Sequence, residues 1–144
     1  MKKGFTLVEF LVSFAIVALV AGISVTYLRQ AGPGSILRAG ALDLATDLRY
    51  ASELAVSTQV RQEVRFNNPS ASSYTIVALS IPEQIVKTIQ LDSSLTFGSI
   101  TLPSNTAEFN SIGSVFAPGT VILQHQNGMQ KTIDIRPSGY VQMY

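Results

Sequence analysis

The sequence predicts an α+β fold: a long N-terminal helix crosses a membrane and continues, with a kink, into an amphipathic helix packed on an antiparallel β-sheet. Three observations predict it. Residues 10–28 carry no charge, and residues 37–55 repeat apolar side chains at helical spacing. From residue 60 onward, short runs of alternating apolar and polar residues are separated by turn-forming residues, as in antiparallel sheets.

The composition narrows the classes of function. The chain has 144 residues, of which 47% are hydrophobic and 13% charged, with a formal net charge of +1. Soluble domains average ~25% charged residues, so part of this chain is expected to contact lipid or another subunit. The absence of cysteine excludes disulfides, a thiol nucleophile and thiolate zinc sites. One histidine and nine scattered acids leave too few groups for a triad or a metal centre. We therefore expect no enzyme, no catalytic residue, no metal and no cofactor.

The uncharged run from Phe10 to Leu28 has the length of a membrane-crossing helix. At 1.5 Å per residue it measures about 28 Å, close to the ~30 Å hydrocarbon core of a bilayer. Lys2 and Lys3 precede the run, and Arg29 follows it. Lysines on the N-terminal side place that end in the cytoplasm and the rest of the chain beyond the membrane.

Three other interpretations of this segment stay open. A cleaved secretory signal peptide has the same basic start, but its apolar region is usually ~7–15 residues long. Residues 20–22, Val-Ala-Gly, are also a weak cleavage site for that class. A plain signal anchor fits the length. A buried helix of a soluble fold fits less well, because the apolar residues surround the whole helix.

Glu9 is the unusual residue of this segment. A carboxylate in a membrane helix costs ~2.5–3.5 kcal/mol at mid-depth and less toward an end, so it is expected to have a partner and a function. No cation lies one helical turn downstream. Lys2 and Lys3 could reach back to Glu9, but Gly4 would then have no role. Alternatively, the chain is cut after Gly4, and the new α-amine of Phe5 on another copy neutralises Glu9.

The first nine residues resemble the prepilin signature of type IV pilins and type II secretion pseudopilins. The resemblance rests on Lys-Lys-Gly-Phe-Thr-Leu-Val-Glu at residues 2–9, followed by the apolar run. It implies cleavage between Gly4 and Phe5 by a prepilin peptidase, N-methylation of Phe5, and contact of Glu9 with a neighbouring subunit during assembly. It also implies a leader peptide over 1–4, a transmembrane and assembly helix over 5–28, and a periplasmic globular domain over 29–144.

The second part of the helix begins after a helix-breaking segment. Ala-Gly-Pro-Gly at residues 31–34 predicts a kink or break near Gly32–Gly34, and Ser35 is a candidate N-cap. Beyond it, one helical face gathers apolar residues that need a sheet to cover them: Leu37, Ala41, Leu44, Leu48, Ala51 and Ala55. The charged residues of this stretch are expected mostly on a solvated face: Arg38, Asp43, Asp47, Arg49 and Glu53.

The strands follow from alternation and turn chemistry. In residues 60–66, Gln62, Val64 and Phe66 share one face, and charged residues take the other. Asn127-Gly128 is a strong hairpin signal, and residues 67–73 have the composition of a turn. The predicted strands cover residues 60–66, 74–79, 85–91, 95–102, 114–116, 120–125, 129–135 and 140–144.

The second half of the chain resembles the GspH/FimT branch of minor pilins and pseudopilins. The similarity lies in residues 37–79, 116–135 and 138–141, and it is more diffuse than the N-terminal signature. It implies a structural subunit at or near the tip of a type II secretion pseudopilus or a type IV pilus, acting in filament initiation, protein secretion or pilus biogenesis. The implied partners are the prepilin peptidase, other pilin or pseudopilin subunits and the lipid of the bacterial inner membrane.

Two further functions are weighed against this one. Some FimT-like relatives bind DNA through basic residues, and the candidates here are Arg61, Arg65, Lys87, Lys131 and Arg136, with Lys131 and Arg136 in the C-terminal part. Residues 138–144 contain no Lys or Arg, so a solvated strand face is favoured and nucleic acid is not expected as a partner. His125 is expected to be an exposed turn residue. The other alternative is a signal-anchored envelope protein that never polymerises.

Overall fold

The computed structural model describes residues 7–67 and 72–144, and of residues 20–31 it describes the backbone only. Helix α1 runs from Leu7 to Thr58. The chain divides into two compact units, Met1–Gly34 and Ser35–Tyr144, and the strands all belong to the second. Each unit is described by itself. The cleavage-site residues Gly4 and Phe5 lie outside the described residues.

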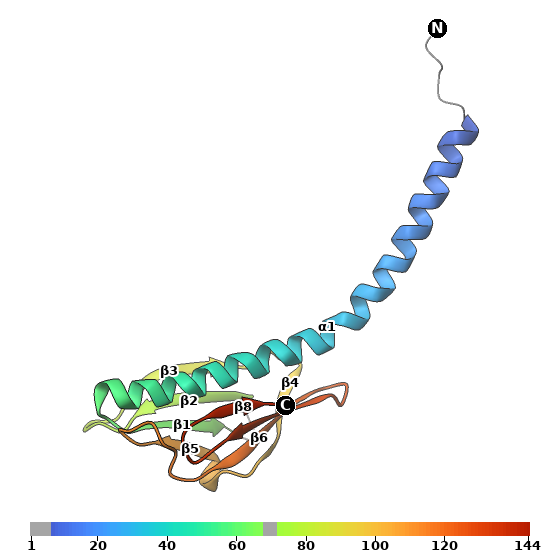
Figure 1. Cartoon of the computed structure of the whole chain (residues 1–144). Coiled ribbons are helices and arrows are strands. Elements are labelled where there is room, and N and C mark those ends of the chain that lie inside the picture. The colour runs from blue at the N-terminus through green and yellow to red at the C-terminus, as the bar shows by residue number, and fades with distance from the viewer. Residues whose placement is uncertain (1–6, 68–71) are drawn as a thin grey trace. The chain divides into compact units, whose positions relative to one another are not determined.

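The second unit contains two four-stranded antiparallel sheets, against which the C-terminal half of α1 packs (Figure 1). The first sheet has the order β3-β2-β1-β5 and is built from β1 (Gln62–Asn67), β2 (Ser73–Ala78), β3 (Gln84–Gln90) and β5 (Thr106–Phe109). The second sheet has the order β4-β6-β7-β8 and is built from β4 (Leu95–Ile100), β6 (Gly119–His125), β7 (Gln130–Ile135) and β8 (Val141–Met143). A short 3₁₀ turn, Pro103–Asn105, precedes β5.

The hydrophobic core lies between α1 and the two sheets. The six apolar helix residues predicted to face a sheet are all buried: Leu37, Ala41, Leu44, Leu48, Ala51 and Ala55. Both sheets contribute to the same cluster, for example through Phe109 and Ile133, which are fully buried. Burial of a leucine-sized side chain contributes about 1.5–3 kcal/mol, so this helical face is a major source of the stability of the second unit.

Strand β1 confirms the predicted alternation. Gln62, Val64 and Phe66 are buried, whereas Glu63 and Arg65 between them are partly exposed. Phe66 meets the ring of Phe97 edge-on at 5.4 Å between centroids and thereby joins the two sheets. The position of each side chain follows from the period of two along a strand.

Two strand predictions are wrong. Residues 106–109 form β5, which pairs with β1, whereas the sequence predicts no strand there. Residues 114–116 contribute only an isolated bridge between Val115 and Phe109. The segment 106–109 alternates partly buried and buried residues, but four residues give a weak periodic signal. Its pairing depends on long-range contact with β1, which local propensity does not encode.

The helix-breaking segment lies inside α1. Gly32, Pro33 and Gly34 end the first compact unit, and the helix continues through them. Ser35 is consequently an interior helix residue, and the prediction that it caps a second helix is wrong. A proline removes one backbone hydrogen bond of the preceding turn, so this part of α1 is held by fewer bonds than its neighbours.

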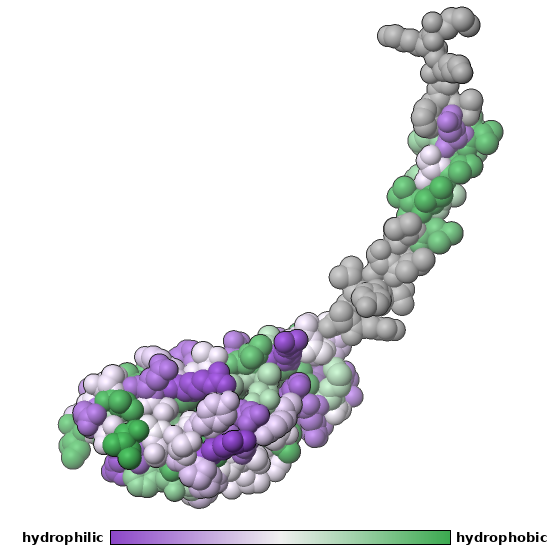
Figure 2. Space-filling model, in the orientation of Figure 1, coloured by the Kyte–Doolittle hydropathy of each residue, from purple (hydrophilic) through white to green (hydrophobic). Residues whose placement is uncertain are grey.

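In the first unit, the described side chains belong to one helix whose apolar residues are exposed within the chain. The large apolar residues from Leu7 to Leu19 are between 54% and 75% exposed within the chain, and Figure 2 shows hydrophobic residues over most of this described surface. Among the residues that the structure describes, no helix reaches the length and apolarity of a membrane span. The predicted span, residues 10–28, includes residues 20–28, whose side chains lie outside the description.

Side chains of α1 hydrogen-bond to backbone carbonyls in the C-terminal part of the chain. The hydroxyl of Ser52 donates to the carbonyl oxygen of Gly113 at 2.8 Å, and the Arg49 guanidinium donates to the carbonyl of Val141 at 2.8 Å. Gly139 packs on the same Gly113 carbonyl with φ of +80°, a left-handed conformation. A side chain at 139 would collide with that carbonyl, so the position requires glycine for both space and backbone.

We expect Gly139→Ala to destabilise the second unit far more than Gly128→Ala. Gly128 has φ of +90° but open space around it, so its alanine variant has only the conformational cost, about 1 kcal/mol. Gly139→Ala adds a backbone collision and should lower the free energy of unfolding by at least about 3 kcal/mol. Urea unfolding of the full chain in detergent, followed by circular dichroism, measures both. Equal losses would contradict the close packing of Gly139 on Gly113.

Candidate functional site for subunit assembly

Glu9 lies in the first turn of α1 and is exposed. Its backbone carbonyl accepts a hydrogen bond from the Ser13 hydroxyl at 2.8 Å. A carboxylate in the first turn of a helix is favoured by the partial positive charge of the helix N-terminus. The sequence thus places the only acid of the first unit where the helix itself stabilises a negative charge.

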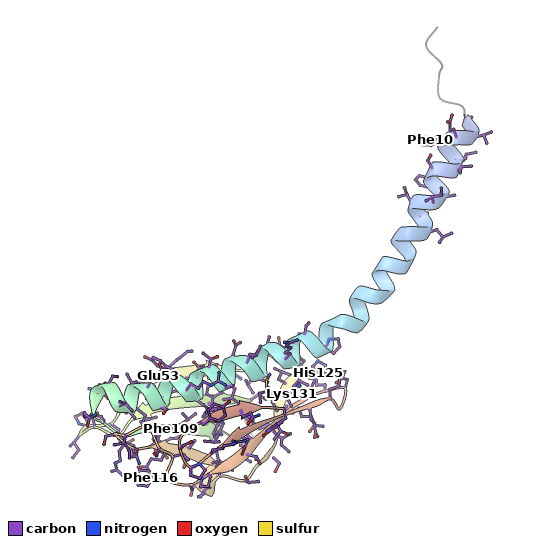
Figure 3. The ribbon with its side chains drawn as sticks, viewed as in Figure 1. Phe10, Glu53, Phe109, Phe116, His125 and Lys131 are labelled. Atoms are coloured by element: carbon purple, nitrogen blue, oxygen red, sulfur yellow. The ribbon has the colours of Figure 1, made fainter. Side chains whose placement is uncertain are left out.

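Apolar side chains surround Glu9 along the helix. Phe10, labelled in Figure 3, stacks on Phe14 with 6.5 Å between ring centroids. The exposed apolar residues of this segment occur on all sides of the helix. A helix that is apolar all round is stable only when lipid or protein covers it. Any such cover takes the Glu9 carboxylate out of water too, and a cation beside it lowers the cost of that burial.

The basic residues proposed for nucleic-acid contact are mostly engaged with acids. Arg61 pairs with Glu108 at 2.8 Å. Arg65 pairs with Glu63 at 2.7 Å and with Glu83 at 3.2 Å, and these hydrogen bonds raise the pKa of Arg65 above its usual value. Ion pairing of this kind neutralises the charge that phosphate binding would use. The outer face of the first sheet is therefore a mixed, near-neutral surface.

Lys131 and Arg136 do not share a surface. Lys131 has the same parity along β7 as the buried Ile133 and Ile135, whereas Arg136 follows the parity of Asp134. The Arg136 guanidinium donates to Gln142 at 2.8 Å and to Asp134 at 3.5 Å. The two candidate residues thus lie on opposite faces of the second sheet, and the structure gives them no common cationic patch.

His125 is buried, so the expectation of an exposed turn residue is wrong. It ends β6, next to the hairpin that Figure 3 marks with His125 and Lys131. Its Nδ1 accepts a hydrogen bond from the backbone N–H of Asn127 at 3.1 Å, and its own backbone pairs with Met129. The ring therefore closes the hairpin at Asn127-Gly128.

Asp47 is a second correction, since it was expected on the solvated face of the helix. Its carboxylate is buried and accepts hydrogen bonds from the Tyr74 hydroxyl and from the Lys87 ammonium, each at 2.7 Å. These three groups fasten α1 to β2 and to the edge strand β3. Asp47 lies three residues after Leu44 and four before Ala51, so the helical period alone could have placed it at the edge of the buried face.

The described residues contain no group of histidine, cysteine and acidic side chains able to hold a metal ion. The first unit presents a helix with an exposed apolar surface and one acid. In the second unit, most acids form ion pairs. Such an arrangement can associate with lipid and with other helices.

Two family descriptions match the sequence. Residues 1–25 match the prokaryotic N-terminal methylation motif, and residues 40–139 match the type II transport protein GspH. No curated protein matches the chain in a sequence search. The GspH match covers most of the second unit.

Solved structures with the same fold include a minor pseudopilin and a minor pilin. The minor pseudopilin EpsH of the type 2 secretion system of Vibrio cholerae is 16% identical with a TM-score of 0.65, over 75% of this chain and 95% of EpsH. The type IV minor pilin FimU of Pseudomonas aeruginosa is 17% identical with a TM-score of 0.63, over 75% of this chain and 87% of FimU. At these identities the likeness establishes the fold: a helix packed on antiparallel sheets.

Removal of the Tyr74 hydroxyl tests the Asp47 cluster. Tyr74→Phe leaves the buried Asp47 with Lys87 alone, so we expect the free energy of unfolding at pH 7 to fall by about 2 kcal/mol. Urea unfolding of the full chain in detergent measures this loss. Tyr140→Phe, at an exposed position, is the matched control and should change little.

The same cluster predicts a loss of stability in alkali. Burial, and then the hydrogen bond to Asp47, raise the pKa of Tyr74. An unfolded tyrosine loses its proton at about pH 10, while folded Tyr74 keeps it. The contribution of the Tyr74 phenol to the free energy of unfolding is therefore complete below about pH 10 and is lost as the pH rises further. Above about pH 10, the free energy of unfolding, measured by urea unfolding at each pH, should fall less steeply in Tyr74→Phe than in wild type. Parallel curves would contradict the role of the phenol.

Proposed function

The chain belongs to the family of the type II transport protein GspH, and on that premise we propose that it is a non-enzymatic minor pilin or pseudopilin at or near the tip of a secretion pseudopilus or a type IV pilus. The observation that carries the proposal is Glu9 in the first turn of an apolar helix that begins at Leu7, inside the methylation motif matched over residues 1–25. Proteins of this family are structural subunits, and an enzymatic activity is not part of the proposal.

In this proposal, the chain is first inserted in the bacterial inner membrane. Residues 5–28 anchor it there, with Lys2 and Lys3 holding the N-terminus in the cytoplasm and the second unit in the periplasm. A prepilin peptidase cleaves between Gly4 and Phe5 and removes both lysines, and the new N-terminus of Phe5 is methylated. The apolar surface from Leu7 to Leu19 supports this proposal, because lipid covers it before assembly and neighbouring helices cover it afterwards.

Glu9 supplies the specificity of docking in this proposal. The freed amine of Phe5 on a neighbouring subunit is cationic, and a carboxylate beside it lowers the cost of burying both charges. The amine exists only after cleavage, so an uncleaved chain lacks the partner group. Paired charges on the second unit support a structural role over nucleic-acid binding, since Arg61, Arg65 and Arg136 already contact acids.

The mass of the mature N-terminus tests the processing step. Protein isolated from its native host should begin at Phe5 and carry one methyl group on the α-amine. Gly4→Leu should block cleavage and leave Lys2 and Lys3 on the chain. A mature protein that begins at Met1 would indicate a signal anchor that is never cut, and one that begins near Gly22 would indicate a secretory signal peptide. Either result would refute the proposal.

Substitution of Glu9 tests the docking step. Glu9→Gln should leave cleavage and membrane insertion intact, because an uncharged side chain is easier to insert. Incorporation into the filament should be lost, since the amine of the neighbouring Phe5 then has no counter-charge. The measurement is recovery of neighbouring subunits in a pull-down, together with N-terminal mass. Glu53→Gln removes a carboxylate from the same helix and serves as the control. If Glu9→Gln recovers as much of the neighbouring subunits as wild type does, the ion-pair mechanism is refuted.

A further inference from the structure

A hollow of about 280 Å³ opens in the second unit between α1 and the segment that joins β3 to β4. Its walls are largely apolar and include Ile36 and Ala39 of the helix and the buried Leu91 and Leu95. Two carboxylates line it as well, Asp43 from the helix and Asp92 from the connecting segment. The hollow thus combines an apolar surface with negative charge.

These two carboxylates stand apart from the other acids of the second unit. Most of those acids form ion pairs: Asp47, Glu63, Glu83, Glu108 and Asp134. Within the described part of residues 35–144, the acids outside ion pairs are Asp43, Glu53 and Asp92, and two of the three line this one hollow. No lysine, arginine or histidine is among its described lining residues.

Both carboxylates are available to a cation. Among the described residues Asp43 makes no hydrogen bond or ion pair, and it is exposed. Asp92 is held by Ser94, whose hydroxyl and backbone N–H donate to Oδ1 at 2.6 and 2.8 Å. These hydrogen bonds lower the pKa of Asp92, so it is ionised at neutral pH. The Oδ2 atom of Asp92 is left to accept from another group.

We propose that this hollow receives an arginine or lysine side chain of another subunit, with the aliphatic stem against the apolar wall and the cationic head between Asp43 and Asp92. Long basic side chains match it because they join an apolar stem to a charged tip. A bare metal ion would leave the apolar wall uncovered. The identity of the partner as a subunit rests on the proposed function, whereas the chemistry of the hollow does not.

A pair of small probes isolates the charge. Nα-acetyl-arginine methylamide and Nα-acetyl-citrulline methylamide have the same stem and nearly the same shape, but only the first is charged. Each is titrated into the isotope-labelled full chain in detergent micelles, and amide shifts are followed by NMR. The arginine probe should shift Ile36, Asp43, Leu91 and Leu95 and bind about fivefold more tightly than citrulline at low salt, a preference that high salt removes. Equal affinities, or shifts elsewhere, would overturn the proposal.

Matched variants locate the effect. Asp43→Asn should reduce the preference for the arginine probe, and Asp43→Asn with Asp92→Asn should abolish it. Asp92 also holds the Ser94 turn, so the single Asp43 variant keeps the test valid if the double variant folds poorly. Glu53→Gln is the control, because Glu53, labelled on α1 in Figure 3, is an acid of the same helix that forms no ion pair and does not line the hollow. An equal loss of preference in Glu53→Gln would reduce the effect to general surface charge and overturn the proposal.

A pull-down from the native host tests the occupant. Asp43→Asn should lower recovery of a neighbouring subunit, while cleavage after Gly4 stays normal. Unchanged recovery would exclude a subunit side chain as the occupant even if the small probe binds. Loss of cleavage in the wild type would instead count against the proposed function, so the two failures are distinguishable.

Discussion

One helix in two different surroundings is the constraint on which the rest of this molecule depends. Over residues 37–55 the apolar side chains of α1 form a single face, and the two sheets cover it. Over Leu7–Leu19 the apolar side chains point in every direction, and nothing in the described chain covers them. The first pattern gives a domain its own core, whereas the second needs lipid or other helices. The change of pattern within one element thus separates a segment that is buried in its own domain from a segment whose apolar surface is exposed within the chain.

The features set by local period were predictable from the sequence. The buried face of α1, the alternation along β1 and the hairpin at Asn127-Gly128 all follow from side chains spaced at 3.6 or at 2, or from a turn dipeptide. Of the candidate assembly site, the position of Glu9 at the start of a helix was predictable too. Gly4 and Phe5 lie outside the described residues, so their role rests on the motif.

The features that depend on contacts between distant segments were not predictable. Strand β5 has only four residues, and it exists because β1 offers it an edge. Asp47 was assigned to solvent by its charge, yet Tyr74 and Lys87 compensate it from strands far along the chain. His125 was expected in an exposed turn, yet it is buried and its ring accepts a hydrogen bond from Asn127. The partners of β5 and of Asp47 lie far along the chain, whereas the contact that holds His125 lies within its own hairpin.

The last strand completes the core of the second unit. Val141 is completely buried in the core, and its carbonyl is held by Arg49 from the helix. Because synthesis runs from the N-terminus, the apolar face of α1 is made long before its final cover. Contacts this distant in sequence form slowly, and an uncovered apolar face is open to aggregation in the meantime. In the proposed membrane-anchored chain, tethering through the first unit would limit collisions between such incomplete chains to those in the plane of the membrane, so the segment proposed for assembly would also protect the folding of the second unit.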